Sequence, residues 1–309
     1  ATQSLTITGD AVFGDSAGDV VGSNAELSSL AVTGTTTING GNGSADSIRT
    51  DGNQDYGDDV ILGRNTTLAS ESAGTINFDG DINGDGTGPW DLLINTQGLT
   101  QLDGGMVGNV NELNNLITDD PGAPANQQGG TTELSGIFNT VLDQTFNDAV
   151  ELTGNVTNNS SMMGDVSYNS TLDGNASPNT LALIVNTAGD TSFNGVVGGS
   201  NPLESVTTDA PGTTSINTTT FNTDGASITF NDPVLVEMDL VITEAGTGDI
   251  TFNNTVVSEN GEFNDLTLNT PGGGNTNING NVGGTVGSGD ELGDLTTDAT
   301  GMTIINVAD

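Results

Sequence analysis

Apolar residues in this chain occur in short runs, most of them β-branched or aromatic, and each run ends in or beside Gly, Asn or Asp. This pattern predicts short strands separated by turns. A helix would need apolar residues spaced by three and four over ten or more positions, and only Asn109–Ile117 fits that spacing weakly. The expected strands include residues 5–8, 36–39, 60–63, 75–78, 92–95, 166–168, 228–230, 250–252 and 266–268.

Degenerate copies of one stretch, LESVTTDAPGTTSIN at 203–217, recur along the chain. Their first leucines, Leu27, Leu113, Leu203 and Leu292, are separated by 86, 90 and 89 residues. Other landmarks keep nearly the same interval: YGDDVIL, FNDAVEL and FNDPVLV, and LLINT, LIVNT and LTLNT. Such self-similarity indicates a repeat protein. We expect repeat units at residues 1–97, 98–188 and 189–271, and a partial fourth unit at 272–309.

Short strands within a longer repeat predict an all-β fold, a parallel β-solenoid or β-helix, with about four coils of about 20 residues in each 90-residue unit. Stacked coils would bury a narrow core of Val, Ile, Leu and Phe that a single coil cannot bury. Gly and Asn suit the corners because they tolerate positive φ angles, and Asn side chains can also pair from coil to coil. An array of β-sandwiches is the alternative fold.

The net charge is −39, with 41 acidic residues against only two arginines. Such a chain would be repelled by nucleic acid and by anionic lipid surfaces, so we expect neither as a partner. No apolar run approaches the length of a membrane span. The two arginines, Arg49 and Arg64, are expected to pair with neighbouring carboxylates.

The chain contains no His, Lys or Cys. A Ser–His–Asp triad, a Cys–His pair, a Schiff base and the common zinc sites are therefore excluded. Only carboxylate chemistry is left, and a polysaccharide-degrading enzyme is the least favoured alternative because Trp90 and two tyrosines are nearly all that could line a sugar cleft. We expect no enzyme activity and no required cofactor.

Calcium is the one ion for which the sequence offers ligands. Residues 79–86, DGDINGDG, contain D-x-N-x-D-G, the opening of a calcium loop whose alternate side chains point oxygens at one centre. The candidate ligands are Asp79, Asp81, Asn83 and Asp85. The match is incomplete, since Leu92 occupies the position where a bidentate Glu is expected, and an acidic corner between coils is the alternative interpretation.

Four stretches carry a family resemblance: TSFNGVVGG at 191–199, LESVTTDAPGTTSIN at 203–217, ITFNDPV at 228–234 and DLTLNT at 265–270. They resemble repeats of filamentous-haemagglutinin-like and giant adhesin-like bacterial surface proteins. The resemblance is one of repeat style rather than of a site. It implies a secreted or surface-attached β-helix that serves as a fibre or stalk.

We therefore expect a structural protein, located outside the cell or at its surface, whose copies join end to end into filaments. The alternative from another class is an adhesin that binds a carbohydrate or a cell surface. No capping element is apparent at either end of the chain, and open ends of a solenoid expose backbone and apolar groups. The residues expected at the joint are Leu5, Ile7, Val12, Phe13, Ile304, Ile305 and Val307.

Overall fold

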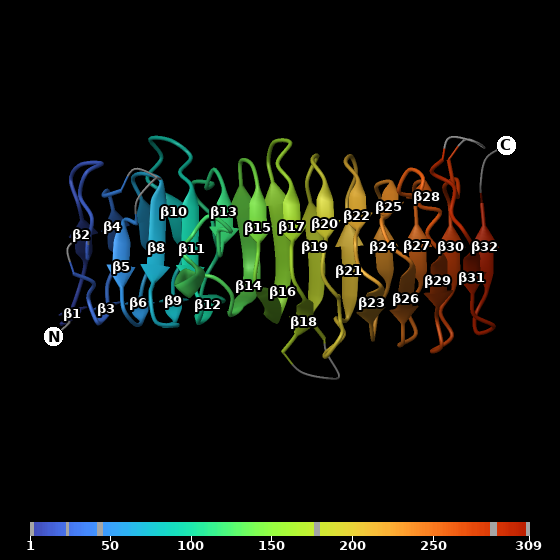
Figure 1. Cartoon of the computed structure of the whole chain (residues 1–309), viewed down its shortest axis with the longest axis horizontal. Helices are drawn as coiled ribbons and strands as arrows, with labels where there is room; N and C mark the ends of the chain where they lie inside the picture. Colours follow the sequence, from blue (N-terminus) through green and yellow to red (C-terminus); the bar gives the residue numbers. More distant parts are fainter. Residues whose placement is uncertain (1–2, 23–24, 42–45, 176–179, 285–288, 307–309) are drawn as a thin grey trace. The chain divides into compact units, whose positions relative to one another are not determined.

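A computed structural model describes residues 3–22, 25–41, 46–175, 180–284 and 289–306. Within these ranges the chain forms short β-strands, and its one helical element is the 3-10 turn η1 (Ala125–Gln127). Contacts divide the chain into two compact units, residues 1–154 with 159–161 and residues 155–158 with 162–309. Both units consist of short strands joined by turns (Figure 1).

Unit 1 is a coil whose turns place strands on three faces. The first face contains β1 (Ser4–Ile7), β3 (Ser29–Val32), β6 (Gln54–Tyr56), β9 (Ile76–Phe78), β12 (Leu99–Leu102) and the start of β14 (Thr131–Thr140). The second contains β2 (Ala11–Phe13), β4 (Thr36–Ile38), β7 (Val60–Leu62) and β10 (Ile82–Gly84). The third contains β5 (Ile48–Thr50), β8 (Thr66–Ser70), β11 (Leu92–Thr96), β13 (Leu116–Thr118) and β15 (Gln144–Phe146).

Unit 2 repeats this arrangement. One face contains β17 (Val166–Tyr168), β20 (Thr191–Phe193), β22 (Thr214–Ile216), β25 (Val234–Val236) and β28 (Val256–Ser258). A second contains β19 (Ala182–Asn186), β21 (Ser205–Thr208), β24 (Ile228–Phe230), β27 (Ile250–Phe252), β30 (Thr276–Ile278) and β32 (Thr303–Ile305). On the third, β23 (Thr220–Thr223), β26 (Leu240–Glu244), β29 (Leu266–Asn269) and β31 (Leu295–Thr297) follow β18 (Leu172–Gly174) through Val197. Strand β16 (Ala149–Ser160) contributes residues to both units.

All pairings named above are parallel, and their register gives the length of a turn. In unit 1 Leu5 pairs with Leu30, and Leu30 pairs with Gln54, so these turns take 30 − 5 = 25 and 54 − 30 = 24 residues. In unit 2 Ile228 pairs with Val206 in the turn before it and with Ile250 in the turn after it. The predicted parallel β-solenoid is thus confirmed over the sandwich, although its turns are slightly longer than the sequence predicted.

Buried and partly exposed residues alternate along most strands, for example in β4, β9, β22 and β27. Because successive side chains of a strand point to opposite faces, every second residue enters the core. In unit 2, Phe193 packs edge-on against Phe221 with ring centroids 5.2 Å apart, and Phe230 stacks on Phe252 at 5.3 Å. Like residues in successive turns therefore form a continuous apolar column.

Asparagine amides pair between turns, as the sequence analysis predicted. In unit 2 the Nδ2 of Asn253 donates to Oδ1 of Asn231 at 2.7 Å, Asn279 donates to Asn253 at 2.9 Å, and Asn306 donates to Asn279 at 3.1 Å. Each Asn directly follows a Phe or Ile at the end of its strand. The corner that begins after these strands is thus tied to the corners before and after it.

The 90-residue sequence interval does not return the chain to the same face. Tyr56 ends β6 on the first face of unit 1, whereas Phe146, the matching position of the next repeat, ends β15 on the third. After β6 the chain returns to the first face at β9, β12 and β14 and then reaches the third face at β15, so the interval is not a whole number of turns. The boundaries predicted at 97, 188 and 271 stay a sequence-level prediction.

The prediction of a weak helical pattern at Asn109–Ile117 was wrong. This segment contains bends, the isolated bridge of Leu113 to Thr140, and the start of β13. Its apolar residues Leu113 and Leu116 are buried against strands of neighbouring turns rather than along a helix face. No helix in the described part of the chain is long and apolar enough to cross a membrane.

Replacing Phe193 by Ala tests the aromatic column. The side chain is fully buried between Tyr168 and Phe221, and we expect the free energy of unfolding to fall by about 3–5 kcal/mol. Phe263→Ala is the matched control, because Phe263 is 51% exposed and its loss should cost less than about 0.5 kcal/mol. Equal effects of the two substitutions on denaturant midpoints would contradict the column.

Candidate functional site

The repeated LLINT, LITDD and related stretches meet at corners of the coil. In unit 1 the backbone N–H of Thr96 donates to Oδ1 of Asp119 at 2.9 Å. The hydroxyl of Thr96 donates to the carbonyl of Gly74 at 2.7 Å and accepts from the N–H of Gly98 at 3.0 Å. One threonine thereby connects three successive turns, and we call this arrangement the Thr–Asp corner.

Unit 2 contains two more Thr–Asp corners. The N–H of Thr187 donates to Oδ1 of Asp209 at 2.8 Å, and the N–H of Thr270 donates to Oδ2 of Asp298 at 3.1 Å. The hydroxyl of Thr187 donates to the carbonyl of Gly164. The recurring sequence therefore encodes a recurring hydrogen-bond pattern, with each Asp supplied by the following turn.

The FND motif forms a second kind of corner around a buried carboxylate. In unit 1 Asp148 accepts from the hydroxyls of Thr118 at 2.9 Å and Thr132 at 2.8 Å. In unit 2 Asp232 accepts from the hydroxyls of Thr208 and Thr214, both at 2.8 Å. Burial raises the pKa of Asp148 and of Asp232, and the threonine hydroxyls partly offset that rise.

A buried glutamine marks a third recurring corner. In unit 1 the amide Nε2 of Gln54 donates to the Thr50 hydroxyl at 3.2 Å and to the carbonyl of Ala69 at 2.8 Å. Gln144 makes the matching bonds to the Thr140 hydroxyl at 3.1 Å and to the carbonyl of Asn159 at 3.0 Å. Gln54 lies on the first face and Gln144 on the third, so the same local design serves different corners.

Asp119 is the most perturbed acid of these corners. Its side chain is buried, its Oδ2 makes no hydrogen bond within the described residues, and its backbone has a positive φ of 51°. Burial, and to a smaller degree the charge of Asp148, raises the pKa of Asp119 to about 8. A buried carboxyl group with a raised pKa makes the stability of the fold depend on pH, since its ionisation would leave a buried charge unpaired.

The two arginines have different surroundings. Arg49, on β5, lies 3.3 Å from Glu26, 3.9 Å from Asp46 and 2.5 Å from Glu71. The expected pairing with carboxylates is therefore confirmed for Arg49. Arg64 forms no ion pair with any residue in the described ranges.

The side chains of the predicted calcium loop all have protein partners. Asp79 accepts from the amide of Asn77, and Asp81 from the N–H of Met106 at 2.8 Å. Asn83 accepts from the N–H of Val110, and Asp85 from the indole N–H of Trp90 at 2.9 Å. Within residues 3–306, gaps excepted, no group of three or more acidic side chains is placed to hold a metal ion. Calcium binding stays a prediction.

The residues predicted at the joint occupy two kinds of position. Register places Leu5, Ile7, Phe13 and Ile305 opposite inward residues of the neighbouring turn. Val12 and Ile304 instead align with the outward Thr37 and Asn277. Val307 lies outside the described residues.

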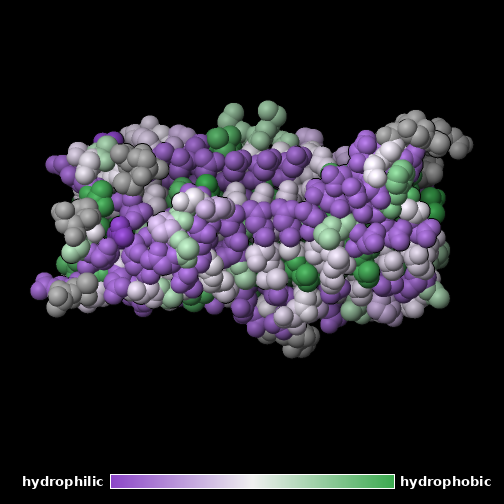
Figure 2. Space-filling model, in the orientation of Figure 1, coloured by the Kyte–Doolittle hydropathy of each residue, from purple (hydrophilic) through white to green (hydrophobic). Residues whose placement is uncertain are grey.

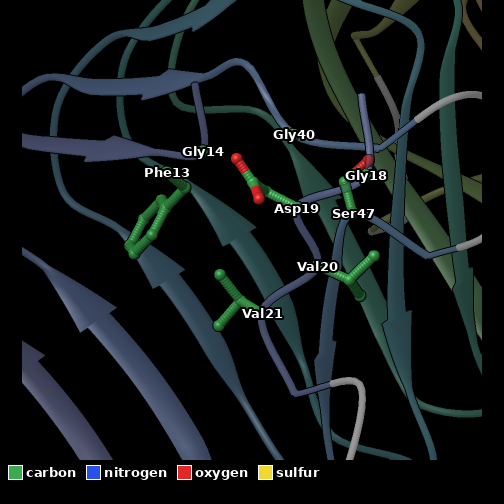
Figure 3. A pocket seen from close by; sticks show the side chains of 8 residues that line it. All are labelled: Phe13, Gly14, Gly18, Asp19, Val20, Val21, Gly40 and Ser47. Atoms are coloured by element: carbon green, nitrogen blue, oxygen red, sulfur yellow. The ribbon is translucent and has the colours of Figure 1, made fainter. Parts of the chain in front are cut away.

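A hollow of about 400 Å³ lies in unit 1 beside the second face. Figure 3 shows Phe13, Val20 and Val21 presenting apolar side chains there, with the carboxylate of Asp19 near Gly14. Asp19 accepts from the N–H groups of Asp15 and Ser16, and these hydrogen bonds lower its pKa. The hollow is lined by Phe13, Gly14, Gly18, Asp19, Val20, Val21, Gly40 and Ser47. The carboxylate of Asp19, the one acid that lines the hollow, thus forms hydrogen bonds within its own loop.

The sequence analysis identified the repeats but missed what their polar residues do. It did not predict that the acids Asp119, Asp148 and Asp232 and the amides Gln54 and Gln144 are buried at corners. The signal was present in TDGNQDY and TVLDQTF, which occupy matching positions of two repeats and share Thr and Gln. These corner side chains form hydrogen bonds with backbone N–H and C=O groups and thereby connect successive turns.

Comparisons with protein-family models, with curated proteins and with solved structures give no match to this chain.

Asp119→Asn tests the buried acid. A folded-state pKa of about 8 lies above the unfolded value, so the native state binds more protons and its stability falls as pH rises from about 4 to 8. Asn keeps the acceptor for Thr96 and cannot ionise. At about 1.4 kcal/mol for each pH unit, we expect a gain of up to about 5 kcal/mol at pH 8 relative to pH 4, measured as a difference in Tm that widens as pH rises.

Asp58→Asn is the control for this experiment, because Asp58 is exposed and the substitution changes the net charge equally. Its effect on Tm should not show the widening with pH that is expected for Asp119→Asn. A pH profile of Asp119→Asn that parallels the parent protein would show that Asp119 titrates normally.

Calcium binding is tested by melting the protein with Ca²⁺ and with Na⁺ at matched ionic strength. If the loop binds the ion, Ca²⁺ raises Tm beyond the effect of salt, and Asp81→Asn removes the difference. The asparagine retains an acceptor for the N–H of Met106, so the corner itself is preserved. An identical Tm in both salts would eliminate the site.

Proposed function

We propose that this protein is a structural subunit of an extracellular fibre or stalk, in which copies stack end to end. The observation that carries the proposal is the exposure of inward positions on the outermost strands. Ile305 of β32 is 58% exposed, whereas Ile278, its register partner in the preceding turn, is 1% exposed. Thr303 of the same strand is exposed opposite the buried Thr276. A further turn would cover both positions.

Unit 1 presents a comparable surface on β1. Leu5 and Ile7 are half-buried, while their register partners Leu30 and Val32 are 0% and 2% exposed. Strand β1 is the outermost strand in the order of its sheet, so one of its edges has no strand beside it among the described residues. Addition of a parallel strand would satisfy the backbone groups of that edge and bury both side chains.

The joint that we propose pairs β32 of one copy with β1 of the next. Such a contact is heterologous, so it continues from copy to copy without closing. With no Lys in the chain, cross-linking through lysine is impossible, and backbone pairing with apolar packing must hold the joint. The charge of −39 per copy opposes association, so salt should promote it.

The sides of each unit support stacking along the coil over lateral association. Figure 2 shows hydrophilic residues covering most of the visible face of each unit, with isolated apolar residues among them. Scattered exposed apolar side chains are normal for a soluble surface. The resemblance of the repeats to bacterial surface proteins supports a location outside the cell.

Electron microscopy of the isolated protein tests the proposal. We expect filaments at moderate salt, and we expect Ile305→Asp to abolish them by placing a charge at the joint. Ile184→Asp is the matched control, since Ile184 is 39% exposed on the outward side of β19, and its filaments should be unchanged. Monomers at every salt concentration, or normal filaments of Ile305→Asp, would refute the joint.

A further inference from the structure

A second hollow in unit 1 brings together the only tryptophan of the chain and the arginine that has no ion pair among the described residues. It has a volume of about 230 Å³ and is lined by Ala17, Gly41, Arg64, Asn65 and Trp90. With 41 acidic residues and two arginines in the chain, a guanidinium without a carboxylate partner in the described ranges is unexpected. Its position beside an aromatic ring and an open space indicates a ligand.

We propose that this hollow binds a carboxylate-bearing sugar ring, stacked on Trp90 and held through its carboxylate by Arg64. The proposal is independent of end-to-end assembly. An indole ring offers a flat apolar surface to the C–H face of a pyranose. A guanidinium presents a planar fork of N–H donors that matches a carboxylate.

Trp90 is held in position before any ligand arrives. Its Nε1 donates to Oδ1 of Asp85 at 2.9 Å, and Asp85 is fixed in turn by the N–H of Thr87 at 2.9 Å. A Cβ at Gly88 would lie 3.5 Å from Cζ2 and 3.7 Å from Cε2 of Trp90, so the backbone of this glycine lies close to the indole ring. A preorganised platform lowers the entropic cost of binding.

The residue after the tryptophan fixes the backbone of the platform. Asp91 accepts from the amides of Asn65 at 2.8 Å, Asn114 at 2.8 Å and Asn115 at 2.7 Å. The N–H of Asp91 donates back to Oδ1 of Asn65 at 3.1 Å. Asn65, which lines the hollow, is thus locked to the strand that follows Trp90, and three turns of the coil support the site.

Charge determines how the sugar must lie. Hydrogen bonding from Trp90 and Thr87 lowers the pKa of Asp85, which keeps that carboxylate ionised beside the indole. The ligand carboxylate must therefore point toward Arg64 and away from Asp85. Repulsion from distant acids is screened beyond roughly 8 Å at physiological ionic strength, whereas the contact with Arg64 is direct.

Because Trp90 is the only tryptophan of the chain, its fluorescence reports binding at the hollow. The full-length protein is titrated with the trimer of galacturonic acid at physiological salt while Trp90 emission is recorded, and with the neutral galactose trimer as comparison. We expect a saturable change with the acidic trimer and at least tenfold weaker binding of the neutral one. Absence of a saturable change, or equal affinity for both trimers, overturns the proposal.

Variants assign the roles. Arg64→Gln should weaken binding of the acidic trimer at least tenfold and bring it close to that of the neutral trimer, and Trp90→Ala should abolish the heat of binding in calorimetry. Ser167→Glu, on the outward side of β17, lowers the net charge by the same amount as Arg64→Gln and should bind normally. If Arg64→Gln fails to fold, Arg64→Lys is used in its place. Undiminished affinity of either variant for the acidic trimer would refute the role of the guanidinium.

Discussion

The structure depends on one constraint: in a stacked parallel coil, each turn must find its hydrogen-bond partners and its packing partners in the turns beside it. A single turn, with its few short strands, buries too little apolar surface to be stable alone. Register then aligns like residues, as in the pairing of Phe230 with Phe252 and of Asn253 with Asn279. The repeated sequence pattern and the stacking of the turns therefore place like residues in the same columns.

The corners are where this constraint is hardest to meet, because the chain leaves one strand and must satisfy its backbone before the next begins. Short polar side chains meet that need. At three corners the backbone N–H of a threonine donates to a carboxylate of the following turn, namely at Thr96, Thr187 and Thr270. At two others a buried carboxylate, Asp148 or Asp232, accepts from two threonine hydroxyls. Part of the acidity of the chain thus serves its interior, while the remaining carboxylates cover its surface.

Two features of the surface are not explained by internal stability. The inward positions of β1 and β32 are more exposed than their register partners in the neighbouring turns. Stacking of copies end to end would bury them. The hollow at Trp90 places a rigid aromatic ring beside an arginine that has no ion pair in the described ranges, which a stalk does not require. A fibre whose sides carry a sugar site would combine a structural role with attachment, and each element can be tested without the other.

The sequence by itself determined the short strands, the parallel coil and the Asn ladders, because period-two burial and repeated corner residues are local signals. Only the tertiary structure decided which face each repeat occupies. Tyr56 and Phe146 hold matching positions in two repeats yet end strands on different faces, since the interval between them is not a whole number of turns. The same holds for the site. Arg64 and Trp90 lie in successive turns, and their meeting at one hollow depends on the register between those turns, which no local pattern encodes.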